Sequence, residues 1–293
     1  IASAARAVVG IPTLPPDVLN DRQAYRRWIA RNATLTPDDR AAIRAHIAML
    51  PSPPLISVVM PVHETEAEHL RAAIASVRAQ LYPHWELCIA DDASTAPHVG
   101  AILAEAAGSD VRIRVMRRGV HGHISAATNS ALALARGEFV ALLDHDDLLA
   151  EHALYEVAAE IARHPDAAVI YSDEDKIDAQ GRLWGPYFKP DFDPDLLLAQ
   201  NLVSHLGVYR RDLVERLGGM REGFEGSPDH DLALRATAAC GQARVRHIRT
   251  VLYHWRRTGE ATSFSEHAQR RCAETRRRAV ADALSARGVA AER

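Results

Sequence analysis

Short apolar runs alternate with amphipathic segments along most of the chain, from Leu55 onward. A run of about four to eight apolar residues between turn residues is typical of a buried strand, and apolar residues three and four positions apart are typical of a helix. This pattern predicts strands at 56–60, 87–90, 111–116, 139–143 and 168–171, and helices at 65–81, 97–107, 124–135 and 154–161. Thr65 and Glu68 have the spacing of a capping box for the first of these helices. Because strands and helices alternate, we expect an α/β fold with a mixed, mainly parallel sheet sandwiched by helices.

The segment before the first predicted strand has a different character. Tyr25, Trp28 and Ile29 fall on one face of a first short helix. A second helix should begin after Thr36, which is followed by proline and two aspartates, a pattern typical of helix starts. It should end near Leu50, where Pro-Ser-Pro-Pro breaks the chain. We therefore predict three parts: a helical extension and linker at 1–54, the main domain at 55–263, and a C-terminal helix at 264–293.

Composition and charge narrow the class of protein. The 293 residues carry a net charge of −3, with 47% hydrophobic and 25% charged residues, which excludes disordered, collagen-like and disulfide-stapled chains. No apolar run approaches the roughly 18 residues of a membrane-spanning helix, and the near-neutral charge favours no nucleic acid. Cys88, Cys240 and Cys272 lack paired spacing, so we expect reduced thiols and a cytoplasmic location. The chain starts at Ile1 without a signal-peptide pattern, so we expect a piece of a longer protein.

Several nucleotide and hydrolase motifs are absent from the sequence, namely G-x-G-x-x-G, the P-loop, H-E-x-x-H and G-x-S-x-G. Their absence counts against dinucleotide oxidoreductases, P-loop NTPases, zincins and α/β-hydrolases. In open α/β sheets, ligands bind beyond the carboxyl ends of the strands. Polar residues at those ends are therefore the candidates for chemistry.

Two of the predicted strands end in acidic residues. One ends at Asp91-Asp92, a pair that also suits a turn or helix cap, and another at Asp144-His145-Asp146-Asp147, where Asp147 is expected to cap the next helix. Side chains two apart on an extended segment point the same way, so Asp144 and Asp146 should face one point. Two like charges there are unfavourable unless a cation or proton lies between them. Since hard divalent ions bind carboxylates together with substrate phosphates, this D-x-D predicts a Mg²⁺ or Mn²⁺ site, although the motif alone is common by chance.

An ordered set of motifs between Leu55 and Ser263 resembles the family 2 glycosyltransferases of the GT-A type. The set consists of Pro61-Val62, Asp91-Asp92, Gly122-x-x-x-Ala126-Ala127-x-Asn129, Asp144-x-Asp146 and Ser227-Pro228-Asp229-His230-Asp231-Leu232. Further stretches are similar to the branch of bacterial O-antigen and surface-polysaccharide assembly: 171–176, Lys189-Pro190, Gly218-Gly219 and 252–256.

The resemblance implies a site for a nucleotide-diphospho-sugar with UDP, dTDP or GDP as its nucleotide. Its donor-binding residues would be Pro61, Val62, Glu64, Asp91, Asp92, Gly122, Asn129 and Asp144. Asp144, Asp146 and His254 would hold the divalent metal, and the imidazole suits Mn²⁺ better than Mg²⁺. Two alternatives stay open: residues 122–129 only start a helix, with Ser125 as its cap, and His254 is structural.

The resemblance also places the general base for the acceptor hydroxyl in the motif around Asp229. If Ser227 caps the helix there, Asp229 shares its buried face with Leu232, whereas Asp231 lies four residues before Arg235 and suits a surface ion pair. We therefore predict Asp229 as the base. A helix start favours the ionised carboxylate, which opposes a base poised near neutral pH. Possible acceptor-side residues are Asp173, Glu174, Asp175 and Asp231, of which the first three suit a solvated acidic loop equally well.

These parts predict an inverting, metal-dependent transfer of a sugar to a hydroxyl of a glycan or lipid-linked acceptor. The chain lacks the Q-x-x-R-W motif and membrane helices of processive members, which favours transfer of one or a few sugars. The C-terminal helix, expected at 265–287, has a basic face that suits peripheral contact with the inner membrane face or simple exposure to solvent. Its arginines are Arg270, Arg271, Arg276, Arg277 and Arg278.

Two other classes of function remain as alternatives. A non-catalytic nucleotide-sugar or glycan-binding module would keep the fold but not need both the D-x-D and Asp229. A nucleotidyltransferase also uses metal-binding acids on an α/β sheet, but the sequence lacks a Gly-rich, lysine-containing loop near the first strand.

Overall fold

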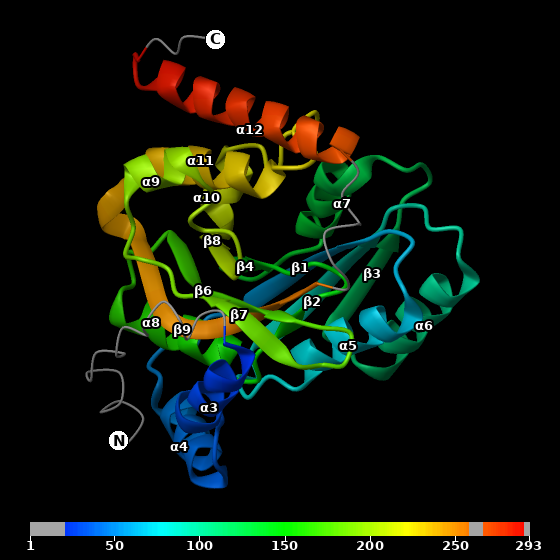
Figure 1. Ribbon diagram of the computed structural model, residues 1–293. Helices are drawn as coiled ribbons and strands as arrows, with labels where there is room; N and C mark the ends of the chain where they lie inside the picture. The colour runs from blue at the N-terminus through cyan, green and yellow to red at the C-terminus, as the bar shows by residue number, and fades with distance from the viewer. Residues whose placement is uncertain (1–20, 258–265, 290–293) are drawn as a thin grey trace.

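The computed structural model describes residues 21–257 and 266–289, in which a single sheet is covered by helices on both faces (Figure 1). The described residues contain the strands β1 (Ile56–Val62), β2 (Trp85–Asp91), β3 (Ile113–Arg117), β4 (Phe139–Leu142), β5 (Leu148–Leu149), β6 (Val169–Ile177), β7 (Leu183–Tyr187), β8 (Gly207–Arg210) and β9 (Val245–Arg256). The helices are α3 (Arg22–Asn32), α4 (Pro37–Met49), α5 (Ala67–Arg78), α6 (Pro97–Ser109), α7 (His123–Leu132), α8 (Ala153–Arg163), α9 (Pro194–Ala199), α10 (Arg211–Arg216), α11 (Pro228–Cys240) and α12 (Glu266–Ala286).

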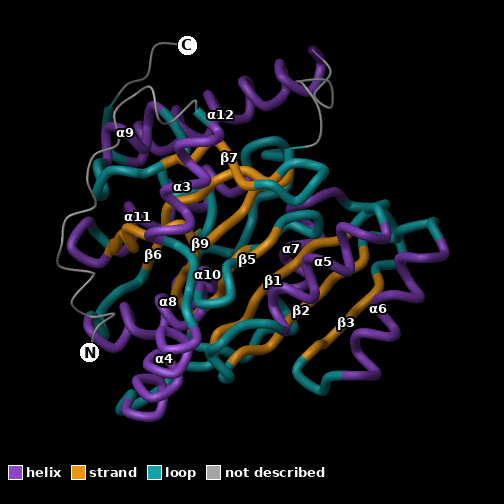
Figure 2. Tube along the Cα trace, turned by 60° about the horizontal axis from the view of Figure 1, so that its bottom comes forward, coloured by secondary structure: helices purple, strands orange, loops and turns teal. Residues whose placement is uncertain are grey.

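The strands lie in the order β3-β2-β1-β4-β8-β6-β9-β5, and β7 pairs with β6. β1 is parallel to β2 and β4, and β2 is parallel to β3, so the carboxyl ends of these four strands share one edge of the sheet (Figure 2). β8 is antiparallel to both β4 and β6, and β9 is parallel to β6. The longest ladders, β1 on β2 and β6 on β9, are parallel, which confirms the mixed, mainly parallel sheet.

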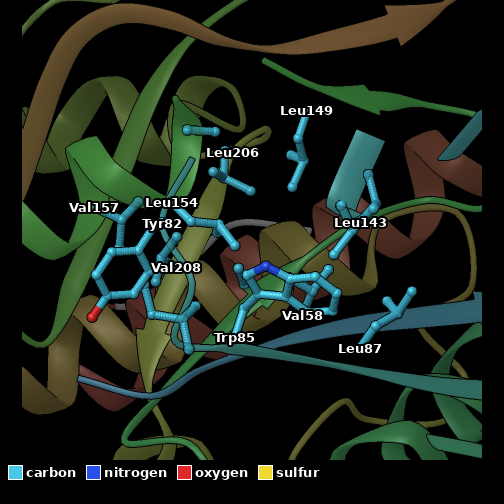
Figure 3. Close-up of a cluster of buried hydrophobic side chains, with 14 of the residues drawn as sticks. Val58, Tyr82, Trp85, Leu87, Leu143, Leu149, Leu154, Val157, Leu206 and Val208 are labelled. Carbon is cyan, nitrogen blue, oxygen red and sulfur yellow. The ribbon is translucent and has the colours of Figure 1, made fainter. Parts of the chain in front are cut away.

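Alternate side chains of the strands enter two apolar layers, one on each face of the sheet. On β1, Val58 faces the layer that α4, α5, α6 and α8 cover, whereas Val59 faces the layer beneath α7, α10 and α11. Figure 3 shows part of the first layer, where Trp85 and Tyr82 pack among aliphatic side chains such as Leu154. Burial of both faces explains why the first strands consist of continuous apolar runs.

The two N-terminal helices pack against the main domain. Thr36 caps α4, as the sequence predicts, and it also forms a capping box with Asp39. Ile43 of α4 belongs to the first apolar layer. Tyr25 of α3 is buried, and its hydroxyl donates to Oδ2 of Asp175 on β6 at 2.7 Å. Since the extension shares an apolar core with the sheet, the packing does not separate it as a domain of its own. The division of the chain at residue 54 therefore stays a prediction.

Several local predictions differ from the structure. α5 begins at Ala67, and its N-cap Glu66 makes no side-chain hydrogen bond, so the capping box expected from Thr65 is wrong. Ser125 lies inside the first turn of α7 and does not cap it. The C-terminal helix is confirmed as α12, although the predicted boundary at 263 lies outside the described residues. The apolar pattern does not reveal β9, because that strand is partly exposed and its charged and aromatic residues interrupt any continuous apolar run.

The same Val→Ala substitution should destabilise the protein much more at a buried position of the core than at an exposed position. Val58 is fully buried, whereas Val111 is 96% exposed. Val58→Ala should lower the free energy of unfolding by about 2 kcal/mol or more, because each buried methylene contributes about 0.8 kcal/mol and the cavity adds to the loss. Val111→Ala should change it by less than about 0.5 kcal/mol. Urea unfolding followed by circular dichroism measures both, and equal losses would contradict the assignment of the core.

Candidate active site

A cavity of about 440 Å³ lies at the carboxyl ends of the parallel strands. We call it the donor-side cavity. It is lined by Pro61, Val62, His63, Asp92, His121, His123, Ile124, Ala127, Asp144, His145, Asp146, Glu225, Gly226 and Cys272. Of the donor-binding residues expected from the sequence, Pro61, Val62, Asp92 and Asp144 line this cavity, and the other four are not among its lining residues.

Asp92 organises the loop that closes one side of the donor-side cavity. Its carboxylate accepts hydrogen bonds from Nε of Arg118 at 2.7 Å and from the backbone N–H of Gly122 at 3.0 Å, and it lies 2.8 Å from Nδ1 of His121. A Cβ at Gly122 would lie only 2.5 Å from the Arg118 guanidinium, so a larger residue here would displace that side chain from Asp92. Gly122 thus acts on Asp92 through its backbone.

The remaining predicted donor residues hold the loops around the cavity. The Glu64 carboxylate accepts hydrogen bonds from the backbone and hydroxyl of Thr95, and these bonds keep the pKa of Glu64 below its ordinary value. Asp91 accepts a hydrogen bond from the backbone N–H of Ser94. The Asn129 amide bonds both the N–H and the carbonyl of Met220 at 2.8 Å. The structure therefore does not bring Glu64, Asp91 or Asn129 to the cavity.

The D-x-D segment forms a turn and not the extended segment that the sequence suggested. The backbone N–H of Asp147 donates to the carbonyl of Asp144, yet Asp144 and Asp146 both line the cavity. Within 21–257 and 266–289, neither carboxylate has a hydrogen-bond or ion-pair partner. Burial, together with the charge of Asp146, raises the pKa of Asp144, and the nearby His205 opposes this shift.

Asp147 has a structural role that differs from the predicted helix cap. It is buried, and its carboxylate accepts hydrogen bonds from the hydroxyl of Tyr253 and the backbone N–H of Arg256, both at 2.6 Å. Burial, followed by the charges of Asp144 and Asp146, raises the pKa of Asp147 well above its ordinary value. Asp147 thereby ties the D-x-D turn to β9.

His205 takes the position beside the acids that the sequence assigned to His254. Its ring stacks on Tyr253 at 4.4 Å between centroids, and its ligand atom lies within 4.8 Å of those of Asp144 and Asp147. His254 follows Tyr253 on β9, so its side chain points to the opposite face of the strand. There its Nδ1 lies 2.6 Å from Oδ1 of Asp175. No spacing in the sequence distinguishes His205, because it lies in a loop distant from the D-x-D.

The residues present fit a divalent cation. Asp144 and Asp146 offer unengaged carboxylates at the wall of a cavity, and His205 offers one imidazole. Hard ions such as Mg²⁺ and Mn²⁺ bind such oxygens, and the imidazole favours Mn²⁺.

A second cavity, of about 450 Å³, adjoins the first and contains Asp229. We call it the acceptor-side cavity. It is lined by Asn201, Ser204, His205, Gly226, Ser227, Asp229, His230, Trp255, Arg257, Cys272, Ala273 and Arg276. Gly226 and Cys272 line both cavities. Asp229 is half-buried, and its Oδ2 accepts a hydrogen bond from Nδ2 of Asn201 at 2.6 Å.

The environments of Asp229 and Asp231, at the start of α11, are the opposite of those expected from the sequence. Asp231 is completely buried, where its carboxylate binds the guanidinium groups of Arg221 and Arg235. The predicted i,i+4 pair with Arg235 is therefore present, but its expected surface location is wrong. Because both carboxylate oxygens have partners, Asp231 holds α11 and does not face the acceptor-side cavity, whereas Asp229 does.

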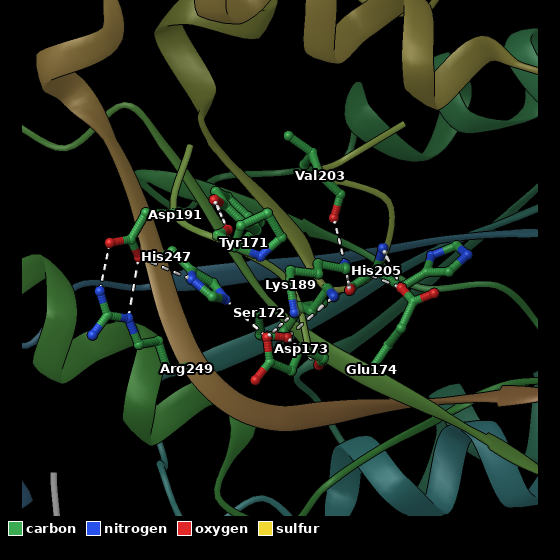
Figure 4. Close-up of polar contacts among 12 residues, drawn as sticks. Tyr171, Ser172, Asp173, Glu174, Lys189, Asp191, Val203, His205, His247 and Arg249 are labelled. Carbon is green, nitrogen blue, oxygen red and sulfur yellow. Dashed lines mark hydrogen bonds and ion pairs between the residues drawn. The ribbon is translucent and has the colours of Figure 1, made fainter. Parts of the chain in front are cut away.

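The acids of β6 form a buried polar network (Figure 4). Asp173 accepts a hydrogen bond from the backbone N–H of Lys189 at 2.9 Å. It accepts a second one from Nε2 of His247 at 2.8 Å in the tautomer that carries the proton on Nε2. Glu174 accepts from Nζ of Lys189 at 3.1 Å, and Asp175 accepts from Tyr25. These three acids therefore form neither an acceptor-lining surface nor a solvated loop.

Among the described side chains of α12, Arg276, Arg277 and Arg278 are exposed. Arg278 donates to the carbonyl of Gly223, whereas the side chains of Arg270 and Arg271 lie outside the described residues. In the part of the chain that the structure describes, no helix has the length and apolar character needed to cross a bilayer. Membrane contact by this face stays a prediction.

The buried network predicts different costs for removing the two lysines of this region. Lys189→Met should lower the free energy of unfolding by about 3–5 kcal/mol, because it leaves the buried Glu174 without its cation. The matched change Lys176→Met should cost about 1 kcal/mol or less, because Lys176 only lies over the Trp184 ring at 4.9 Å. Chemical denaturation of both variants measures the difference, and equal costs would refute the role given to Lys189.

Comparison with known proteins shows the family to which the chain belongs. Residues 57–218 match the model of the family described as glycosyl transferase family 2. The chain is 42% identical over 282 residues to the O-antigen biosynthesis protein RfbC of Myxococcus xanthus, which covers 96% of this chain and 21% of that protein. The chain spans about a fifth to a quarter of the length of two curated relatives to which it is 42% and 47% identical.

Two solved structures share the fold. Residues 1–349 of S. aureus TarS, in complex with UDP-GlcNAc, match with a TM-score of 0.59 and 21% identity over 78% of this chain and 71% of that one. The mannosyltransferase PcManGT of Pyrobaculum calidifontis, in complex with GDP-Man and Mn²⁺, matches with a TM-score of 0.58 and 18% identity over 92% and 75%. Because the family model spans more than half of the 293 residues, the chain belongs to glycosyl transferase family 2, with a sheet of the GT-A type.

Proposed function

We propose that this chain transfers a sugar from a nucleotide-diphospho-sugar to a hydroxyl of a glycan or lipid-linked acceptor, with inversion, in surface-polysaccharide synthesis. The observation that carries the proposal is the pair of adjoining cavities, one with the unengaged carboxylates of Asp144 and Asp146 and the other with Asp229. TarS with UDP-GlcNAc, PcManGT with GDP-Man and the O-antigen protein RfbC support this class of donor and product.

We assign the donor to the first cavity. Pro61 and Val62 line it at the end of β1, and Asp92 holds the loop at its side. Asp144 and Asp146, with His205 in place of His254, would hold the divalent metal. That ion, when bound, acts as a Lewis acid and template that stabilises the charge of the departing diphosphate. The complex of PcManGT with Mn²⁺ supports this assignment.

We assign Asp229 as the general base. Asn201 donates to one carboxylate oxygen and leaves the other to accept the proton of the acceptor hydroxyl. As that proton moves to Asp229, the acceptor oxygen attacks the anomeric carbon and the bond to the diphosphate breaks, so the configuration inverts. A base of this kind contributes about 10²–10⁴-fold to the rate.

The state of the cysteines supports a location for this reaction. The three cysteines are free, and Cys272 lies at the wall that the two cavities share. Free thiols are typical of cytoplasmic proteins, and we place the reaction there. The activity, substrates and partners of the whole protein are part of this proposal, because the chain spans only part of its relatives.

Nucleotide release from UDP-, GDP- and dTDP-sugars, with Mn²⁺, Mg²⁺ or EDTA, tests the proposal. The parent should release one nucleotide in a metal-dependent way. Asp146→Asn should lower kcat/KM on the order of 10²-fold or more, since it removes a ligand of the ion that stabilises the leaving group. Asp229→Asn should lower transfer to an acceptor by about 10²–10⁴-fold while donor binding is kept.

Glu222→Gln is the matched control, because Glu222 is exposed and lies outside both cavities. It should behave as the parent. Metal-independent release, or equal activity of Asp229→Asn and Glu222→Gln, would contradict the mechanism. If calorimetry detects nucleotide binding without turnover of any donor, the binding-module alternative is favoured instead.

A further inference from the structure

The acceptor-side cavity carries an excess of positive charge. Arg257 and Arg276 line it, and among the lining residues that the structure describes Asp229 is the one with a carboxylate. In the described part of the chain, neither guanidinium forms an ion pair with a carboxylate, whereas the nearby Arg221 and Arg235 both bind Asp231. Like charges at one cavity repel each other, and a bound anion would lower this repulsion.

From this arrangement we propose that the acceptor carries an oxyanion group, a carboxylate or a phosphate, close to the hydroxyl that receives the sugar. Arg257 and Arg276 would bind this group while Asp229 faces the hydroxyl. The inference rests on the proposed function, because it assigns a substrate class to the second cavity of that site. Guanidinium groups suit this task because their planar donors match carboxylate and phosphate oxygens.

A second observation also indicates a polar ligand in this cavity. His230 is 1% exposed, and its Nε2 lies 2.7 Å from the carbonyl oxygen of Leu197. Because a carbonyl can only accept, Nε2 carries the proton, and Nδ1 of the neutral ring is an acceptor. Nδ1 is buried and has no hydrogen-bond partner in the structure. An unpartnered acceptor on a residue that lines the cavity fits a ligand with hydroxyl groups, once the ring shifts enough to expose Nδ1.

Trp255 provides the apolar part of the same wall. Its ring is partly exposed, and the Arg257 guanidinium lies 4.6 Å from the ring centroid. A cation held over an aromatic face loses less freedom when it binds an anion. The cavity thus offers the apolar ring of Trp255, the hydrogen-bond acceptor of His230 and two arginine side chains. Together these groups fit an acidic sugar or a sugar phosphate.

The basic surface of α12 does not account for these features by itself. Arg276, Arg277 and Arg278 are adjacent in sequence and all exposed, but only Arg276 of the three lines the cavity. A helix face adapted to a membrane surface would need neither an unpaired buried Nδ1 at His230 nor a second arginine, Arg257, directly after β9.

Calorimetric titration with three small probes tests the inference. The probes are methyl β-glucuronide, which carries a carboxylate, glucose 6-phosphate, which carries a phosphate, and the neutral methyl β-glucoside. Each is titrated into the full chain with saturating UDP, GDP or dTDP and Mn²⁺ at low salt. At least one anionic probe should bind about tenfold or more tightly than the glucoside, and the stronger of the two identifies the source of the oxyanion.

The double variant Arg257→Gln/Arg276→Gln should lose this preference, so that the anionic probe binds no more tightly than the glucoside. Arg277→Gln is the control, because it removes one charge from the same helix outside the cavity, and it should keep the preference. Thermal unfolding of each variant shows whether the fold is kept.

Equal binding of all three probes, absence of binding by both anionic probes, or an unchanged preference in the double variant would overturn the inference. These results are independent of nucleotide release, so the two proposals can fail separately. Donor turnover without an anionic preference refutes only the inference. Arginine-dependent anion binding without turnover of any donor refutes only the proposed reaction.

Discussion

The buried ammonium group of Lys189 is the interaction on which both cavities depend. Its side chain is completely buried, and it donates to the carboxylate of Glu174 on β6 and to the carbonyls of Val203 and His205. Burial lowers the pKa of Lys189, and the charge of Glu174 opposes this shift. Because a buried charge without partners is strongly unfavourable, the loop at 201–206 must stay against β6.

That loop contributes to both sides of the site. Its first residue, Asn201, donates to the proposed base Asp229, and His205 lies beside the acids of the D-x-D turn. In a solvated loop the polar residues of β6 would face water. In the structure they are buried and hold the loop at 201–206 in place (Figure 4). The network of Lys189 and the β6 acids lines neither cavity. It affects the site through the loop at 201–206, which it holds in place.

Local patterns predicted much of the fold and part of the site. Continuous apolar runs identify β1, β2 and β4, because both faces of these strands are buried. The acids at the ends of such strands meet at one edge of a parallel sheet, so Asp92 and Asp144 could be placed near a cavity from the sequence. Periodicity fails for β9, where polar residues on a half-exposed strand hide the pattern.

The sequence by itself determined where the first strands lie along the chain, the family motifs and the acids at the strand ends, because these depend on near neighbours in the sequence and on periodic burial. Only the tertiary structure decided that Asp231 is buried between Arg221 and Arg235 and that Asp229 faces a cavity. It also decided that His205, and not His254, lies close to Asp144 of the D-x-D. These assignments depend on which distant segments share a charge or a hydrogen bond, and no local spacing encodes that.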